Sequence, residues 1–252
     1  MNAQVDRPIG CVALLFAMEE EGRPIAERLS LGEAEQLHEQ LPARIRRGRL
    51  GSLEIIHCVN GVDPIHGVDR IGTESATLTA WLLAETCRPD LLVNAGTCGG
   101  FESRGGSIGR TYLASGDLLF HDHKVPIPGF REQGEGRIAT LDTGKLANTL
   151  GIRTGVVSSG ASLTARPDEL EFFDREAVIA KDMEATAIGV VARDLGLPFL
   201  ALKAVTDLVD HPEPSHEAFL RNLASTTARL TDHLEALLRF IEEGRSIQDL
   251  AG

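Results

Sequence analysis

Three carboxylates stand directly after apolar, strand-like runs of the sequence: Glu21, Glu184 and Asp207. In open α/β sheets the carboxyl ends of neighbouring strands meet at one edge, and ligand sites form there. Three converging carboxylates could supply a general base for water, a general acid for a leaving group and a ligand for substrate hydroxyls. Each also has a structural explanation, since Glu21 and Glu184 would stabilise the first turn of a helix and Asp207 would cap a loop. Their joint placement favours a shared site.

A glycine-rich segment, NAGTCGG at 94–100, follows another buried run. Its glycines predict a turn along which the backbone can approach a ligand closely, and Thr97 adds a hydroxyl. The segment fits neither the GxGxxG nor the Walker pattern, so it gives little support to phosphate binding.

His121 and His123 could share one face of a strand and bind a metal ion. A zinc site needs three or four protein ligands, and no partner motif such as HExxH is present. A surface loop or a subunit contact is the favoured interpretation, and we expect no metal. The sequence also contains no GxSxG elbow and no Ser or Cys in a recognisable nucleophile context.

Composition limits the partners of this chain. Its 252 residues include 25 Lys and Arg against 37 Asp and Glu, a formal net charge of −12, without a large basic cluster. Nucleic-acid binding is therefore not expected, and a hydrophobic content of 42% excludes intrinsic disorder. The longest fully apolar run, 11–18, is far shorter than the roughly 18–20 residues that span a bilayer. With four scattered cysteines, which fit a reducing compartment, we expect a soluble, cytoplasmic protein without a membrane partner.

Strand-length apolar runs alternate with helical periodicities, which predicts an α/β fold with a mostly parallel or mixed sheet covered by helices on both faces. The expected strands are 11–17, 44–50, 53–59, 90–95, 111–120, 153–158, 177–180 and 198–205, and the expected helices are 19–30, 73–86, 143–150, 183–195 and 215–243. The second and third strands should form a hairpin, and the Pro/Gly-rich segment 125–136 should be a loop. Residues 1–252 are expected to form one domain, with 1–10 and 244–252 as peripheral tails.

Five segments, taken in order, resemble the 5′-methylthioadenosine/S-adenosylhomocysteine nucleosidases of the purine nucleoside phosphorylase-like superfamily. They are AMEEE at 17–21, NAGTCGGF at 94–101, FHDHKVPIPG at 120–129, KDMEATA at 181–187 and KAVTDLVD at 203–210. Each alone is moderately specific, but the ordered set is highly specific and covers nearly the whole chain. The HDxxxPIP and LKAVTDLVD stretches look more like the plant-type branch than the common bacterial enzyme. The resemblance implies a three-layer α/β/α fold around a central mixed, twisted sheet, a homodimer, and no cofactor.

The resemblance also implies a role for each matching residue. Glu21 would activate the attacking water, and Asp207 would protonate purine N7 so that adenine can leave. Glu184 would bind the ribose hydroxyls and stabilise the cationic sugar, with Met183 packed beside the sugar and Thr97 near the ribose and the water. The remaining substrate-binding candidates are Met18, Leu163, Lys181, Asp182 and Thr206. An acid role requires Asp207 to hold a proton, which demands burial or neighbouring negative charge.

Hydrolysis is favoured over phosphorolysis because the three glutamates at 19–21 would repel phosphate. Two positions depart from the family's pattern: Ala161 stands where the family often has Asp, and Leu163 stands where many bacterial members place an aromatic against adenine. The plant-type branch also tolerates leucine there. Segment 211–219, by resemblance, closes over the 5′-substituent of the substrate.

The leading hypothesis is a nucleosidase that cleaves 5′-methylthioadenosine, with S-adenosylhomocysteine as a second candidate substrate. Four alternatives stay open. One is a hydrolase of another nucleoside, such as a futalosine-type substrate, which would keep Glu21 but alter the pocket for the 5′-substituent. The others are a phosphate-dependent nucleoside phosphorylase, a catalytically silent nucleoside-binding module, and a metal-dependent hydrolase built on His121 and His123.

Overall fold

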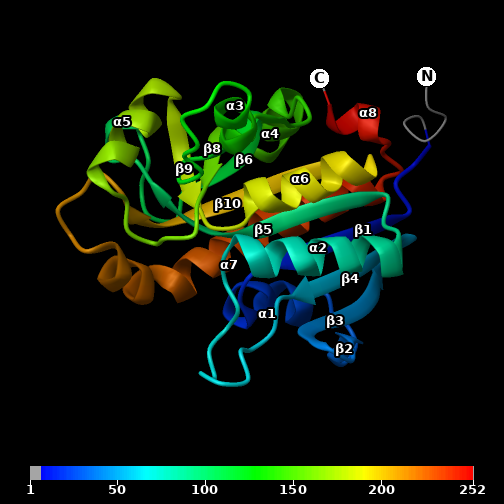
Figure 1. Ribbon diagram of the computed structural model, residues 1–252. Coiled ribbons are helices and arrows are strands. Elements are labelled where there is room, and N and C mark those ends of the chain that lie inside the picture. The colour runs from blue at the N-terminus through cyan, green and yellow to red at the C-terminus, as the bar shows by residue number, and fades with distance from the viewer. Residues whose placement is uncertain (1–6, 252) are drawn as a thin grey trace.

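The computed structural model describes residues 7–251, and a mixed β-sheet forms its centre (Figure 1). The strands are β1 Cys11–Phe16, β2 Glu35–His38, β3 Leu41–Leu50, β4 Leu53–Val59, β5 Leu91–Gly100, β6 Thr111–Phe120, β7 Ile138–Ala139, β8 Arg153–Ser159, β9 Val178–Asp182 and β10 Phe199–Leu208. Their order is β10-β6-β8-β9-β5-β1-β4-β3-β2, with β7 beside β6. β1 is parallel to β4 and β5, whereas β3–β4 and β10–β6 are antiparallel pairs. The predictions of an α/β fold, a mixed sheet and the β3–β4 hairpin are confirmed.

Strand β10 closes part of the sheet on itself. It pairs with β6 and, in parallel, with β5, while β5 pairs with β9 through Gly99 and Gly100. The pairings β10–β6–β8–β9–β5–β10 thus form a closed circuit that a simple open sheet lacks. The circuit brings the carboxyl-terminal residues of β5, β9 and β10 to one cavity.

Helices pack against both faces of the sheet (Figure 1). They are α1 Glu19–Arg28, α2 Thr73–Cys87, α3 Phe130–Glu135, α4 Gly144–Leu150, α5 Pro167–Arg175, α6 Ala185–Leu195, α7 Ser215–Glu242 and α8 Ile247–Leu250. Alternate residues of β1 enter two separate core clusters, as the pleat of a strand requires. Ala13 and Leu15 share a cluster with α2 and α6, whereas Val12 and Leu14 share one with α1 and α7.

Strands β5, β9 and β10 extend at least two residues past their predicted carboxyl ends, and the predicted turn at 96–100 is wrong. β5 continues through Gly100, β9 continues to residue 182, and β10 continues to residue 208. The glycines of β5 serve close packing instead of a turn. A Cβ atom on Gly96 would lie 3.1 Å from a Glu21 carboxylate oxygen, and one on Gly100 would lie 2.9 Å from the Val205 side chain. Several candidate residues therefore project from ordered strands.

Other differences concern short elements. The prediction omits β2, β7, α5 and α8, and the expected loop 125–136 contains α3. Helix α5 carries a recognisable start signal, because Pro167 occupies its first position and acidic residues follow. Helix α3 begins where the Gly129 N–H donates to the Glu132 side chain, a local cap within a segment whose composition favours a loop.

The described parts of the two expected tails are anchored to the core. Ile9 and Leu250 are buried, and Pro8 forms a bridge with Ser246. Residues 1–6 and 252 lie outside the described residues. Between residues 7 and 251, no helix has the length and apolar character needed to cross a membrane.

Candidate active site

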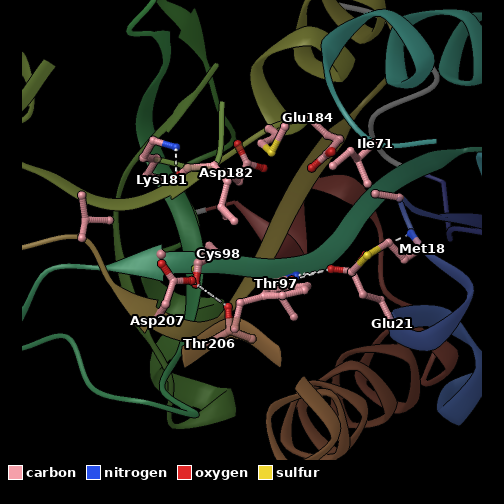
Figure 2. Close-up of a pocket in the computed structure, with 16 residues that line it drawn as sticks. Met18, Glu21, Ile71, Thr97, Cys98, Lys181, Asp182, Glu184, Thr206 and Asp207 are labelled. Atoms are coloured by element: carbon pink, nitrogen blue, oxygen red, sulfur yellow. Dashed lines mark hydrogen bonds between the residues drawn. The ribbon is translucent and has the colours of Figure 1, made fainter. Parts of the chain in front are cut away.

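A cavity lies where the carboxyl ends of β5, β9 and β10 meet the start of α1 (Figure 2). Its volume is about 130 Å³, and the residues that line it are Ala17, Met18, Glu21, Ile71, Thr97, Cys98, Gly99, Leu163, Lys181, Asp182, Met183, Glu184, Thr206, Asp207, Val209 and Phe219. Every residue that the sequence suggests as catalytic or substrate-binding is among them. Of the other lining residues, all but Ile71 lie in segments that the sequence analysis singles out. Ile71 was missed because an isolated apolar residue carries no chemical signal in a sequence.

Glu21 is surrounded by hydrogen-bond donors. Its Oε1 accepts bonds from the backbone N–H and the hydroxyl of Thr97, each at 2.7 Å, and its Oε2 accepts the Met18 N–H at 3.2 Å. An ionised carboxylate only accepts, so these donors favour the charged form. Burial raises the pKa of Glu21, and the Thr97 bonds and the charge of Lys203 oppose that rise. The result is a buried carboxylate that is a stronger base than an exposed one.

Asp207 lies across the cavity from Glu21 (Figure 2), just after a register shift in β10. Its Oδ1 accepts the Thr206 hydroxyl at 3.0 Å, and that hydroxyl also lies 3.2 Å from the Cys98 carbonyl oxygen. Burial raises the pKa of Asp207, while the hydroxyls of Ser215 and Thr206 oppose the rise. The Asp207 environment therefore favours the protonated form that a general acid needs.

Glu184 occupies the position just before α6, not the first turn of the helix as the sequence suggests. Its Oε1 accepts the backbone N–H of Gly72, at the start of α2, at 2.8 Å. Burial raises the pKa of Glu184 to about 7; Lys203 opposes this rise, and the nearby carboxylates of Asp182 and Glu21 add to it. Glu184 therefore changes charge close to neutral pH.

A fully buried ion pair lies beside these carboxylates. Lys203 Nζ is 2.6 Å from Asp182 Oδ2, and the two side chains are 1% and 0% exposed. Asp182 also accepts the Ser159 hydroxyl at 2.5 Å and the Ala185 N–H at 3.0 Å. Lys203 is not among the site residues predicted from the sequence, although a lysine within an apolar strand is itself a signal, because buried lysines are almost always paired.

Lys181 is buried, and its ammonium donates to the backbone carbonyl oxygens of Ser162 and Leu163, the latter at 3.0 Å. Burial lowers the pKa of Lys181, and surrounding carboxylates, Glu169 foremost, oppose the decrease. Leu163, which faces the cavity, thus has its backbone held by a lysine that the sequence suggests as substrate-binding.

The two histidines of the 121–123 motif have separate environments. His121 is buried, with Nδ1 3.0 Å from Ser158 Oγ, and burial lowers its pKa to about 4. His123 stacks on Phe120 with 4.1 Å between ring centroids. Across the described part of the chain, no group of three or more His, Cys, Asp or Glu side chains is arranged to hold a metal ion. The metal hypothesis therefore finds no ligand set there.

Comparisons with known proteins match nearly the whole chain. The family model of the phosphorylase superfamily matches residues 12–239. A 5′-methylthioadenosine nucleosidase of Arabidopsis thaliana is 37% identical, over 99% of this chain and 93% of the relative. A second protein of that plant, a 5′-methylthioadenosine/S-adenosylhomocysteine nucleosidase, is 34% identical, over 97% and 96%. The apo structure of Arabidopsis 5′-methylthioadenosine nucleosidase superposes with a TM-score of 0.93 at 36% identity, covering 96% of this chain and 100% of that one.

Proposed function

The chain belongs to the phosphorylase superfamily and, within it, to the 5′-methylthioadenosine/S-adenosylhomocysteine nucleosidases, and from that premise we propose that it hydrolyses the N-glycosidic bond of 5′-methylthioadenosine. The products are adenine and 5-methylthioribose. S-Adenosylhomocysteine, which one relative's name includes, is the second substrate of the proposal. The observation that carries the proposal is the pair of buried carboxylates, Glu21 and Asp207, on opposite sides of one cavity.

We assign the general base to Glu21. Its donors from Thr97 and Met18 hold the carboxylate in one orientation while burial keeps its pKa above the ordinary value. A water molecule beside it would lose a proton to Glu21 as its oxygen bonds to C1′ of the ribose. A correctly placed base of this kind contributes about 10²–10⁴-fold to a rate.

We assign the general acid to Asp207. Cleavage of the bond between C1′ and N9 leaves negative charge on the purine, and a proton delivered from Asp207 to N7 neutralises it. The raised pKa of Asp207 supports this role, because the group must hold its proton until the bond breaks. The two carboxylates thus receive opposite tasks from different environments.

The other cavity residues bind the two ends of the nucleoside. Glu184, with one oxygen bonded to the Gly72 N–H, would use its carboxylate for the ribose hydroxyls and for the positive charge that develops on the sugar. Met183 and Met18 would pack against the sugar and its 5′-substituent. Leu163 and Thr206 would contact the base, and Asp182 would act through its bond to Lys203.

Charge at the cavity supports water over phosphate as the nucleophile. Among the lining residues, Lys181 is the only Lys or Arg, and its ammonium is bonded to two carbonyls. Near the start of α1, Arg46 forms an ion pair with Glu19 at 2.6 Å, so its charge is already compensated. The carboxylates of the lining would repel an entering phosphate dianion.

The substrate range follows from comparing the release of the free base from 5′-methylthioadenosine, S-adenosylhomocysteine and a nucleoside with a bulky 5′-substituent of the futalosine type. We expect release from 5′-methylthioadenosine. Base release only from the third compound would replace the proposed substrate and leave the hydrolytic chemistry in place.

We further propose a single domain over residues 1–252 with a three-layer α/β/α arrangement, a homodimer and a cytoplasmic location with a role in methionine salvage. Two core clusters on opposite faces of β1 support the layers, and four free thiols fit a reducing compartment. Exposed apolar side chains on segment 61–72 and α2 support the dimer: Val62, Ile65, Val68, Ile71, Leu78 and Trp81. A monomeric mass by light scattering would contradict it.

A further inference from the structure

Residues 160–163 form a segment without helix or strand that brings Leu163 to the cavity. Lys181 holds its far end, because the ammonium donates to the carbonyl oxygens of both Ser162 and Leu163. Lys181 is only 4% exposed, so water cannot readily replace those bonds. A buried ammonium is costly unless its donors are used, and here two of its three donors fix one short stretch of backbone.

Asp122 holds the near end of the same segment. Its Oδ2 accepts the Ala161 N–H at 2.7 Å. Ala161 is the position at which the sequence departs from the resemblance, since an aspartate is common there. The structure supplies a carboxylate at this point from a different part of the chain, the 121–123 motif that follows β6.

His121 packs directly against the start of this segment. A Cβ atom on Gly160 would lie 2.3 Å from His121 Nε2, so only glycine permits the close approach of the segment to the buried ring. The ring is fixed in turn by the contact of its Nδ1 with Ser158. Residues 160–163 are thus held at both ends by hydrogen bonds, and the start of the segment packs against the His121 ring.

We propose that Lys181 and Asp122 are positioning residues that hold segment 160–163 as the wall of the base-binding part of the cavity, and so determine the affinity for the purine. The inference rests on the proposed function, because that function places the purine between Asp207 and Leu163. Asp122 is not part of the cavity lining, so it acts through the backbone of the segment. Lys181 lines the cavity, but its bonds are to backbone carbonyls. Neither residue takes part in bond cleavage.

Adenine binding measured by calorimetry tests the proposal without turnover. Lys181→Met, which keeps the length but removes the donors, and Asp122→Ala should each weaken adenine binding by about 10-fold. Asp122→Asn retains an acceptor and should stay within about threefold of the wild type. Lys124→Met removes a half-exposed lysine that pairs with Asp168 at the surface, and serves as the matched control with unchanged affinity. In turnover, KM should rise in Lys181→Met while kcat stays within about threefold.

The double variant of Lys181→Met and Asp122→Ala separates positioning from direct contact. Because both residues hold one segment, the combined loss should be smaller than the product of the two single losses. Weaker adenine binding in Lys181→Met, together with normal adenine binding in Asp122→Ala, would show that Lys181 contacts the base and would overturn the proposal. If Lys181→Met fails to fold, the comparison of Asp122→Ala with Asp122→Asn decides alone, and equal affinities would overturn it. A wild-type protein that binds adenine but hydrolyses no nucleoside would refute the proposed function and leave this comparison valid.

Discussion

The Lys203 ammonium lies 2.6 Å from the Asp182 carboxylate, and both side chains are shielded from solvent. Each charge has lost its water, so each depends on the other for compensation. The same positive charge opposes the effect of burial on the pKa of both Glu21 and Glu184. It is not among the groups that shift the pKa of Asp207. Lys203 thus lowers the pKa of the proposed base, Glu21, without acting on that of the proposed acid, Asp207, so the two carboxylates have different electrostatic environments.

Lys203→Met should lower the free energy of unfolding by about 3–5 kcal/mol, because Asp182 would remain buried without its cation. Turnover should fall as well, since Glu21 would lose a charge that favours its ionised form. Urea unfolding and adenine release measure the two effects separately. Combining Lys203→Met with Asp182→Asn should recover much of the stability but not the turnover.

A surface ion pair provides the control for this variant. Arg28 lies 2.6 Å from Asp232, but the two side chains are 38% and 66% exposed. Arg28→Met should therefore leave the free energy of unfolding nearly unchanged. Similar small losses for Arg28→Met and Lys203→Met would contradict the importance given to the buried pair.

Glu21→Gln should reduce kcat by about 10²–10⁴-fold, because the amide cannot accept a proton from water. Binding of the nucleoside should persist, since the cavity keeps its shape. Timed adenine assays and calorimetry with 5′-methylthioadenosine measure these properties. Glu20→Gln, at the exposed neighbouring position, is the control and should behave as wild type. Near-normal turnover in Glu21→Gln would remove the base assignment.

Thr97→Val should change the pH dependence of the reaction. It removes the hydroxyl that donates to Glu21 Oε1 at 2.7 Å. Since that bond favours the ionised carboxylate, the pKa of Glu21 should rise further, and the acid limb of kcat/KM should move to higher pH. Thr97→Ser retains the donor and should keep the wild-type profile. An acid limb that is the same in both variants would rule out this coupling.

The contribution of Glu184 to the stability of the free protein should decline as the pH rises from about 5 to about 8. The buried His57 and His121, each with a pKa lowered to about 4, act in the opposite direction as the pH rises toward 6.5. Burial raises the pKa of Glu184 from 4.5 to about 7, so the native state binds this proton more tightly than the unfolded state. The contribution to stability is complete below pH 4.5 and disappears as the pH passes 7, a difference on the order of 3 kcal/mol. Glu184→Gln removes this contribution, so the Tm of the variant should rise relative to that of the wild type as the pH increases from about 5 to about 8. Glu85→Gln, at an exposed position of α2, serves as the control with a wild-type curve. A curve unchanged in Glu184→Gln would count against a buried, titrating Glu184.

The sequence places Glu21, Glu184 and Asp207 correctly at the carboxyl ends of strands, because each follows an apolar run and the strand-end rule is general. It could not reveal that β10 pairs with both β5 and β6, since that closure depends on contacts between distant segments. The extension of β5 through Gly100 was also hidden, because glycine in a sequence signals a turn more often than close packing. Asp122 shows the same limit: its carboxylate meets Ala161 only in the folded chain.

Adenine release from 5′-methylthioadenosine in phosphate-free buffer, repeated after addition of phosphate, tests the central claim most directly. The proposed role of Glu21 as the base that activates water predicts release at the same rate in both buffers, with free 5-methylthioribose as the second product. Release that requires phosphate, with a sugar 1-phosphate as the product, would contradict it.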